Sequence, residues 1–258
     1  FKGGVEMNQN QKRIPMPARY AINAALVVLA FVALNLITGA LSSYYTKILM
    51  LVGINIILAV SLNVATGYLG QLPLGHAGFM AVGGYAAGIF LNAMPMPNLD
   101  KLPEGANAAA AHLQYNFYVV LALLLAGLVA AIFGIIIGVP ALRLKGDYLA
   151  IITLGFGEII RVVLLNIDSV LGFDFTFGAS GLKRIPKAAT VSNVFICVVI
   201  TCLVIHMVMK SRHGRAILSI RENEIAAESC GIHTTYYKVM AFTLSAFFAG
   251  VAGALYAT

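Results

Sequence analysis

Charged residues are scarce in this chain. Only 10% of its 258 residues are Asp, Glu, Lys or Arg, whereas 60% are hydrophobic, and the mean hydropathy is +0.89. Soluble globular proteins carry about 25% charged residues. The shortage excludes a soluble globular fold and leaves no soluble domain to bind nucleic acid, so the basic pI near 9.4 needs another explanation.

Clustered metal and thiol ligands are also lacking. The three cysteines have no CxxC spacing, and we expect them to pack as small hydrophobic side chains rather than to form disulfides or bind metal: Cys197, Cys202 and Cys230. Most histidines are scattered, which disfavours an integral-membrane enzyme: His112, His206, His213 and His233. We therefore expect no catalytic residue, no metal and no cofactor.

Long apolar runs are what the sequence has in abundance. A membrane-spanning helix needs about 20 mostly apolar residues, and these runs do not alternate as the strands of a membrane barrel do. The sequence therefore predicts an all-α, polytopic membrane bundle surrounded by lipid. Seven segments are expected to span: Tyr20–Leu41, Tyr45–Thr66, Gln71–Leu91, Phe117–Val139, Tyr148–Ile167, Val191–Met209 and Val239–Thr258.

The two ends bear on domain organisation. Residues 1–19 are predicted to be a tail and residues 20–258 a single transmembrane domain. Basic residues before the first apolar run suggest a secretory signal, but that run is too long and no small-residue cleavage site follows it cleanly. Because Met7 offers a native start, residues 1–6 are expected to be non-native, and because Thr258 ends an apolar segment, further helices are expected to follow.

Lysine and arginine predict the orientation, because positively charged loops stay cytoplasmic. With the N-terminus inside, eleven of them lie in the tail or in inner loops and five in outer loops, with Arg161 inside a segment. The reverse orientation inverts this balance. The cluster of Lys183, Arg184 and Lys187 on the outer side is the one local exception. The high pI thus reflects membrane topology.

The third apolar segment is unusually rich in glycine, and it contains Pro73. Broken backbone at membrane depth lines binding sites in transporters, so the segment predicts a broken helix. A tightly packed helix with a Gly84–Gly88 contact pair is the alternative, and the two readings can hold for different halves. Gln71 and His76 there serve either as structural hydrogen-bonding groups or as part of a solute path.

The fifth segment carries two charges, Glu158 and Arg161, on one helix face. Intramembrane charges are costly, so this face is expected to look toward the bundle interior, either as a structural ion pair or in contact with a solute. Thr153 lies on another face of the same helix. Small residues at helical spacing in other segments predict packing seams: Gly134, Gly138, Ala246, Gly250 and Ala254.

Residues 210–238 form a charged inner loop. Arg215–Ile220 and Asn223–Cys230 have helix-forming composition, with Asn223 as a candidate N-cap and Gly231 as a candidate C-cap. A short helix with exposed alanines is suited to fill a groove on another protein. The loop therefore predicts a soluble partner on the inner side.

Four blocks taken together resemble the transmembrane permease subunits of ABC importers, specifically the branched-chain amino-acid permeases of the LivM type. The blocks are GYLGQLPLGHAGFMAVGGYAAG from Gly67, LRLKGDYLAIITLGFGEIIR from Leu142, GRAILSIRENEIAAESCGI from Gly214 and KVMAFTLSAFFAGVAGALYA from Lys238. They cover about two thirds of the chain, in the order and spacing of that family.

The resemblance implies a subunit that forms a translocation path with a second, LivH-type permease in the bacterial inner membrane. It also implies cytoplasmic ATP-binding subunits on the inner loop and a periplasmic or extracellular solute-binding protein outside. The wider family's EAA…G signature places Ala226, Ala227 and Gly231 in the coupling helix, but Ile225 stands where the glutamate is usual. The segment Phe177–Leu182 also departs from the family's TGG-x-x-GL pattern.

Residue roles follow as expectations. Arg221, Glu222 and Glu224 are expected to fix the register of the ATPase contact, and Ala226, Ala227 and Gly231 its fit. Candidates for the translocation path are Asn55, Asn63, Gln71, His76 and Thr153. A urea or amide permease would share every block, whereas an ion-coupled secondary transporter would leave the inner loop without a role.

Overall fold

A computed structural model describes residues 16–40, 42–94, 106–144, 146–171, 185 and 189–258. Most of the predicted tail and the segment Phe177–Leu182 lie outside this set. Within it the secondary structure is helical, without strands, as the composition predicts. The helices are α1 (Met16–Ala40), α2 (Ser43–Asn63), α3 (His76–Ala93), α4 (Ala106–Ala141), α5 (Asp147–Leu171), α6 (Val191–Lys210), α7 (Arg212–Glu222), α8 (Glu224–Ser229) and α9 (Thr234–Ala257).

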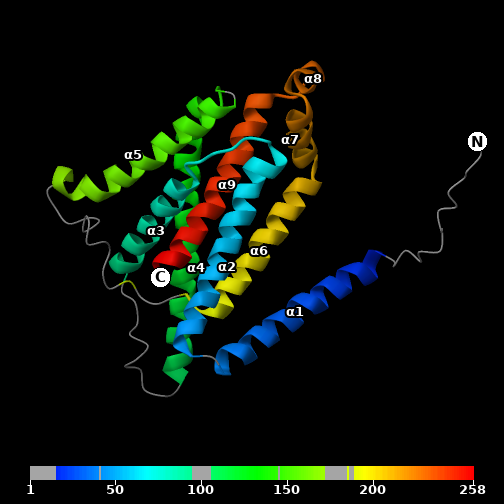
Figure 1. Cartoon of the computed structure of the whole chain (residues 1–258). Coiled ribbons are helices and arrows are strands. Elements are labelled where there is room, and N and C mark those ends of the chain that lie inside the picture. The colour runs from blue at the N-terminus through cyan, green and yellow to red at the C-terminus, as the bar shows by residue number, and fades with distance from the viewer. Residues whose placement is uncertain (1–15, 41, 95–105, 145, 172–184, 186–188) are drawn as a thin grey trace, which may run out of the picture.

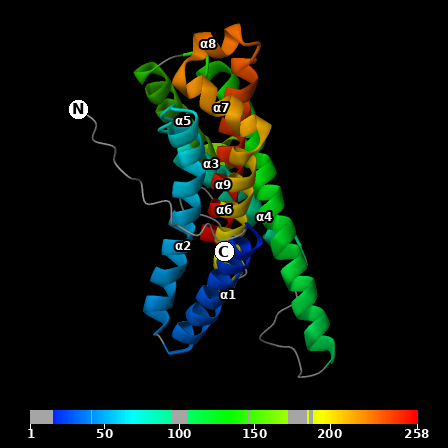
Figure 2. The same ribbon diagram turned by 90° about the vertical axis from the view of Figure 1, so that its right-hand side faces the viewer.

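Helix α9 forms the centre of the bundle. It packs on α2, α3 and α4, while α6 lies against α2, and α5 leans on α3 and α4 (Figure 1). Helix α1 contacts α6 and lies to the side of the main group in Figure 1, and in the turned view it is seen between the lower ends of α2 and α4 (Figure 2). The short helices α7 and α8 gather at one end of the bundle, between α6 and α9.

Glycine and alanine explain why α9 can be central. An added Cβ at Gly83 of α3 would lie 2.3 Å from the Cα of Gly250, and one at Gly253 would lie 1.9 Å from the Met80 carbonyl oxygen. On the α4 side, an added Cβ at Gly134 would lie 2.7 Å from the Cβ of Ala246. The predicted packing seams are therefore confirmed, and they bring α3, α4 and α9 into backbone contact.

Among the described residues, five helices are long and apolar enough to cross a membrane; they comprise α2 with its extension to Tyr68, residues 114–141 of α4, residues 148–168 of α5, α6 and α9. In α1 the described apolar stretch is Ala25–Gly39. Helix α3 has 18 residues, about 27 Å at 1.5 Å per residue, and it begins at His76. The sequence-based start at Gln71 is wrong, because residues 69–75 lie between two helices.

Candidate functional site

The break in the third segment begins where α2 changes its winding. Residues Val64–Tyr68 form a π-helical turn, and Gly70 follows with φ +75°, a conformation that glycine adopts without strain. The Gln71 amide donates to the Ala65 carbonyl oxygen at 3.0 Å, but Pro73 has no N–H to continue the ladder. The predicted broken segment is present, and it spans Leu69–Gly75.

Helix α5 holds the far end of the break. The Leu74 amide donates to Thr153 Oγ1 at 3.0 Å, and that hydroxyl donates to the Ala150 carbonyl oxygen at 3.0 Å. Gly75 approaches so closely that an added Cβ would lie 2.0 Å from the Thr153 carbonyl oxygen. The Thr153 side chain, on a residue only 2% exposed, thus anchors a backbone N–H that a helix would otherwise satisfy.

A second anchor joins α3 to α2 and α9. His76 Nε2 lies 3.0 Å from Ser61 Oγ, and because that hydroxyl donates to the Leu58 carbonyl oxygen at 2.8 Å, it accepts from the imidazole. The Ser245 hydroxyl of α9 donates to the Ser61 carbonyl oxygen at 2.7 Å. The first residue of α3 is therefore positioned by hydrogen bonds rather than by apolar packing alone.

The remaining candidates for the translocation path differ in their exposure and in their distance from the break. Asn55 is exposed on α2 and donates to the Leu51 carbonyl oxygen at 2.9 Å. Asn63 is exposed, and its Oδ1 occupies the space that a Cβ at Gly67 would need. Gln71 is half-buried, and its Oε1 has no hydrogen-bond partner among the described residues. Gln71 thus lies within the break and Asn63 at the end of α2, just before the π-helical turn, whereas Asn55 lies two helical turns earlier on α2.

The charged pair of α5 faces outward. Arg161 Nη1 and Glu158 Oε2 are 3.2 Å apart, so the two charges pair, but their side chains are 68% and 62% exposed. The expectation that this face looks into the bundle is wrong for the chain by itself. The reason is that α5 rests on α3 and α4 through its other side, where Thr153 and Ile160 are buried.

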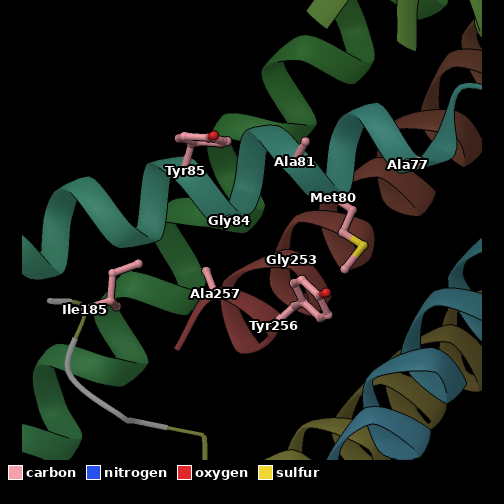
Figure 3. Close-up of a pocket in the computed structure, with 9 residues that line it drawn as sticks. All are labelled: Ala77, Met80, Ala81, Gly84, Tyr85, Ile185, Gly253, Tyr256 and Ala257. Carbon is pink, nitrogen blue, oxygen red and sulfur yellow. The ribbon is translucent and has the colours of Figure 1, made fainter. Parts of the chain in front are cut away.

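Sequence reasoning missed a cavity between α3 and α9. It has a volume of about 380 Å³, and small residues leave the space open along both helices (Figure 3). Met80 of α3 and Tyr256 of α9 lie near one end and Ile185 near the other, with Tyr85 on the opposite side of α3 from Met80 (Figure 3). The available signal was the pair of tyrosines set among glycines and alanines in segments three and seven.

The inner loop folds into two capped helices. The Asn223 side chain accepts from the Ala226 amide at 3.1 Å and begins α8. Gly231, with φ +81°, ends it, since its amide donates to the Glu228 carbonyl and that of Ile232 donates to the Ala227 carbonyl. Both caps were predicted from the sequence and both are confirmed.

Helix α8 is fastened to the start of α9 by two polar contacts. Lys238 Nζ donates to Glu224 Oε1 at 2.6 Å, and the Thr234 hydroxyl donates to Glu228 Oε1 at 2.6 Å. The Lys238 side chain is only 6% exposed and that of Glu224 29%, so this ion pair is largely removed from water.

The other predicted coupling residues divide between core and surface. Ala227 is buried in a cluster that includes Ile217 and Ile220 of α7. The exposed ones are Arg221, Glu222, Ala226 and Gly231. Ile225, where the family signature has glutamate, is 75% exposed. Arg221 Nη1 also donates to the carbonyl oxygen of Gly67.

The helices of membrane length pack around a broken, glycine-rich segment, and two capped helices lie outside the spans. This arrangement defines a polytopic membrane protein of permease architecture. Residues 44–258 match the family described as branched-chain amino acid transport system / permease component. The chain belongs to this family.

Curated relatives agree with the family. The chain is 36% identical over 238 residues to the high-affinity branched-chain amino acid transport system permease protein LivM of Salmonella typhimurium, and 35% identical over 238 residues to that of Escherichia coli K12. Each match covers 79% of this chain and 50% of the relative, so the chain spans about half the length of these relatives.

A more distant relative is the probable branched-chain amino acid transport permease protein LivM of Methanocaldococcus jannaschii. It is 22% identical over 228 residues, covering 82% of this chain and 66% of that protein. No solved structure matches the chain significantly.

Proposed function

We propose that the chain is the transmembrane permease subunit of an ATP-driven importer for branched-chain amino acids. The observation that carries the proposal is the α7–α8 unit, a pair of capped helices outside the membrane-length spans, of which α8 is fastened to α9. Such a unit suits a soluble partner that moves, and membership of the permease family supports cytoplasmic ATP-binding subunits as that partner. An ion-coupled transporter has no use for it.

The ATPase contact that we propose is mainly apolar. Glu224 and Glu228 already accept hydrogen bonds from α9, so their carboxylates serve the fold of α8. The apolar residues that α8 exposes are Ile225 and Ala226, and the exposed polar residues nearby are Glu222, Glu228 and Ser229. A large apolar side chain that is 75% exposed gains most by entering a pocket on a partner. Buried Ala227 seats α8 on α7, and Gly231 ends the helix.

A second, LivH-type permease is proposed to cover α5. A charged residue at mid-membrane costs about 2.5–3.5 kcal/mol on insertion scales, and Glu158 and Arg161 lie ten or more residues from Tyr148 on an exposed face. Facing lipid, the pair would retain much of that penalty. A partner helix or a water-filled path along α5 removes it, so this face is where the subunit interface and the translocation path are proposed to meet.

The solute path is proposed to run from the α3–α9 cavity toward the break. Met80, Tyr85 and Tyr256 offer apolar surface and phenol groups for an aliphatic amino acid, and the cavity of about 380 Å³ accommodates one such solute. Asn63 and Gln71 supply amide groups beside the break, and Asn55 one farther along α2. His76 and Thr153 are proposed to shape the path through the hydrogen bonds that hold the break.

In this arrangement the protein lies in the bacterial inner membrane with its N-terminus and α7–α8 on the cytoplasmic side. A periplasmic or extracellular binding protein delivers the solute to the opposite face. The lysine and arginine distribution supports this orientation. A urea or amide permease remains the competing solute assignment, because the inner-loop argument applies equally to it.

Reconstitution with the ATP-binding subunits, the second permease and the binding protein tests the proposal. We expect leucine-loaded binding protein to stimulate ATP hydrolysis and leucine uptake, with urea without effect. Ile225→Asp should reduce the ATP-binding subunits that copurify by about tenfold, whereas Ile225→Leu should retain them. Leucine uptake without ATP, or normal copurification with Ile225→Asp, would refute the importer or the docking contact respectively.

A further inference from the structure

Arg221 joins the inner loop to the end of α2. It lies in the last turn of α7, and its Nη1 donates to the carbonyl oxygen of Gly67 in the π-helical turn after α2. Its aliphatic stem covers Gly70, where an added Cβ would lie 3.0 Å from the Arg221 Cγ. Two segments that are 154 residues apart in the sequence are thus joined by one side chain.

The position of this contact is chemically suitable for an arginine. Carbonyl groups at the end of a helix lack the amide partners of the next turn and carry partial negative charge. A guanidinium donates a charge-assisted hydrogen bond to such a carbonyl and remains charged at any physiological pH. Gly70 lets the stem approach because it has no side chain and adopts φ +75°.

We propose that Arg221 is a positioning residue that couples α7 to the break at Leu69–Gly75, rather than a residue that docks the ATPase. The inference rests on the proposed importer function, and it replaces the role that the sequence suggests for Arg221. When the partner moves α7–α8, Arg221 carries that displacement to the end of α2, where the chain leaves the helix.

The surrounding contacts show why a displacement there reaches the rest of the bundle. Helix α8 packs on α7 through Ala227, which is buried with Ile217 and Ile220, and Lys238 fastens α8 to α9. The break is fastened at its other end to Thr153 of α5 and continues into His76 of α3. A displacement of the break at its Gly67 end therefore changes the contacts between α2, α3 and α5. Alternating access requires contacts that differ in this way between the inward-open and outward-open states.

One test measures coupling in the reconstituted full complex. Arg221→Ala is expected to lower the number of leucine molecules transported per ATP hydrolysed by about tenfold, the factor that corresponds to the loss of one hydrogen bond from a charged donor. The amount of ATP-binding subunits that copurify should stay at the wild-type level. Arg221→Lys should restore part of the ratio. Arg215→Ala is the matched control, because Arg215 lies on the same helix and, among the described residues, its side chain donates to the Lys210 carbonyl at the end of α6 and not to the break.

A second test does not depend on transport. In the full-length permease in nanodiscs, hydrogen exchange is followed at the amides of Leu69 and Gln71, which donate to carbonyls of the π-helical turn. Arg221→Ala should accelerate their exchange by about tenfold, and Arg215→Ala should leave it unchanged.

The outcomes separate the two proposals. Loss of the ATP-binding subunits from the Arg221→Ala complex would make Arg221 a docking residue and overturn the inference, as would an unchanged transport ratio or unchanged exchange. If the wild-type complex neither binds those subunits nor transports leucine, the proposed function fails. The exchange result then still decides whether Arg221 holds the break.

Discussion

The ion pair between Lys238 and Glu224 makes an asymmetric prediction. Glu224→Ala leaves an ammonium group on a side chain that is only 6% exposed, whereas Lys238→Met leaves a carboxylate on a side chain that is 29% exposed and can take up water. Removing one partner of a buried pair costs 3–5 kcal/mol. Because Glu224 is partly exposed, we expect about 2–3 kcal/mol for Glu224→Ala and about 1 kcal/mol for Lys238→Met.

The cost should appear as local opening of α8, since this pair holds the helix to α9. At 1.36 kcal/mol per factor of ten, 2–3 kcal/mol corresponds to about 30- to 150-fold faster hydrogen exchange over residues 226–232. The double variant removes both charges and lets methionine fill the space of the lysine stem. It should therefore open less often than Glu224→Ala alone.

Exchange over residues 226–232, measured by mass spectrometry in nanodiscs, compares the three variants with the wild type. The amides of Cys230, Gly231 and Ile232 are the reporters, because each donates within the α8 turn. The reasoning is refuted if Lys238→Met opens α8 more than Glu224→Ala does. It is refuted equally if the double variant is the least protected of the three.

Two further predictions concern the bundle itself. Ser61→Ala removes the acceptor of His76 and leaves a half-buried imidazole N–H without that partner, which should lower the free energy of unfolding by about 1–2 kcal/mol and the thermal midpoint in detergent by about 3–6 °C. Ser61→Thr keeps a hydroxyl and should lose less stability, and equal losses in the two variants would argue against the bond. Gly253→Ala places a methyl group against the Met80 carbonyl of α3 and should lower the free energy of unfolding by about 1–3 kcal/mol. Gly39→Ala, which has open space around it, should be neutral, and comparable unfolding midpoints for the two variants would contradict the close helix contact.

Much of the local structure could be predicted because it depends on nearby residues. The α8 caps at Asn223 and Gly231 depend on groups within a few residues, so composition and spacing were sufficient. The start of α3 was harder. Gly70 and Pro73 indicated a break, but its extent depends on Thr153, which accepts from the Leu74 amide, and on Ser61, which accepts from the His76 imidazole.

The candidate site was predicted by residue type better than by role. Glu224 and Arg221 were both singled out for a partner, yet one pairs with Lys238 and the other with the Gly67 carbonyl. The sequence predicted that Glu158 and Arg161 pair but placed them on the wrong side of the bundle. The cavity beside Tyr256 was missed, because it exists only where α3 and α9 meet.

The amino-acid sequence by itself determined that this protein is a membrane bundle of helices, where its apolar segments lie and which small residues form its seams. Hydropathy and helical period decide these properties locally. Only the tertiary structure decided which neighbour each helix face meets, and therefore that α5 turns its charges outward and that Arg221 reaches the break. A helical period specifies which residues share a face, but the partner of that face comes from distant parts of the chain.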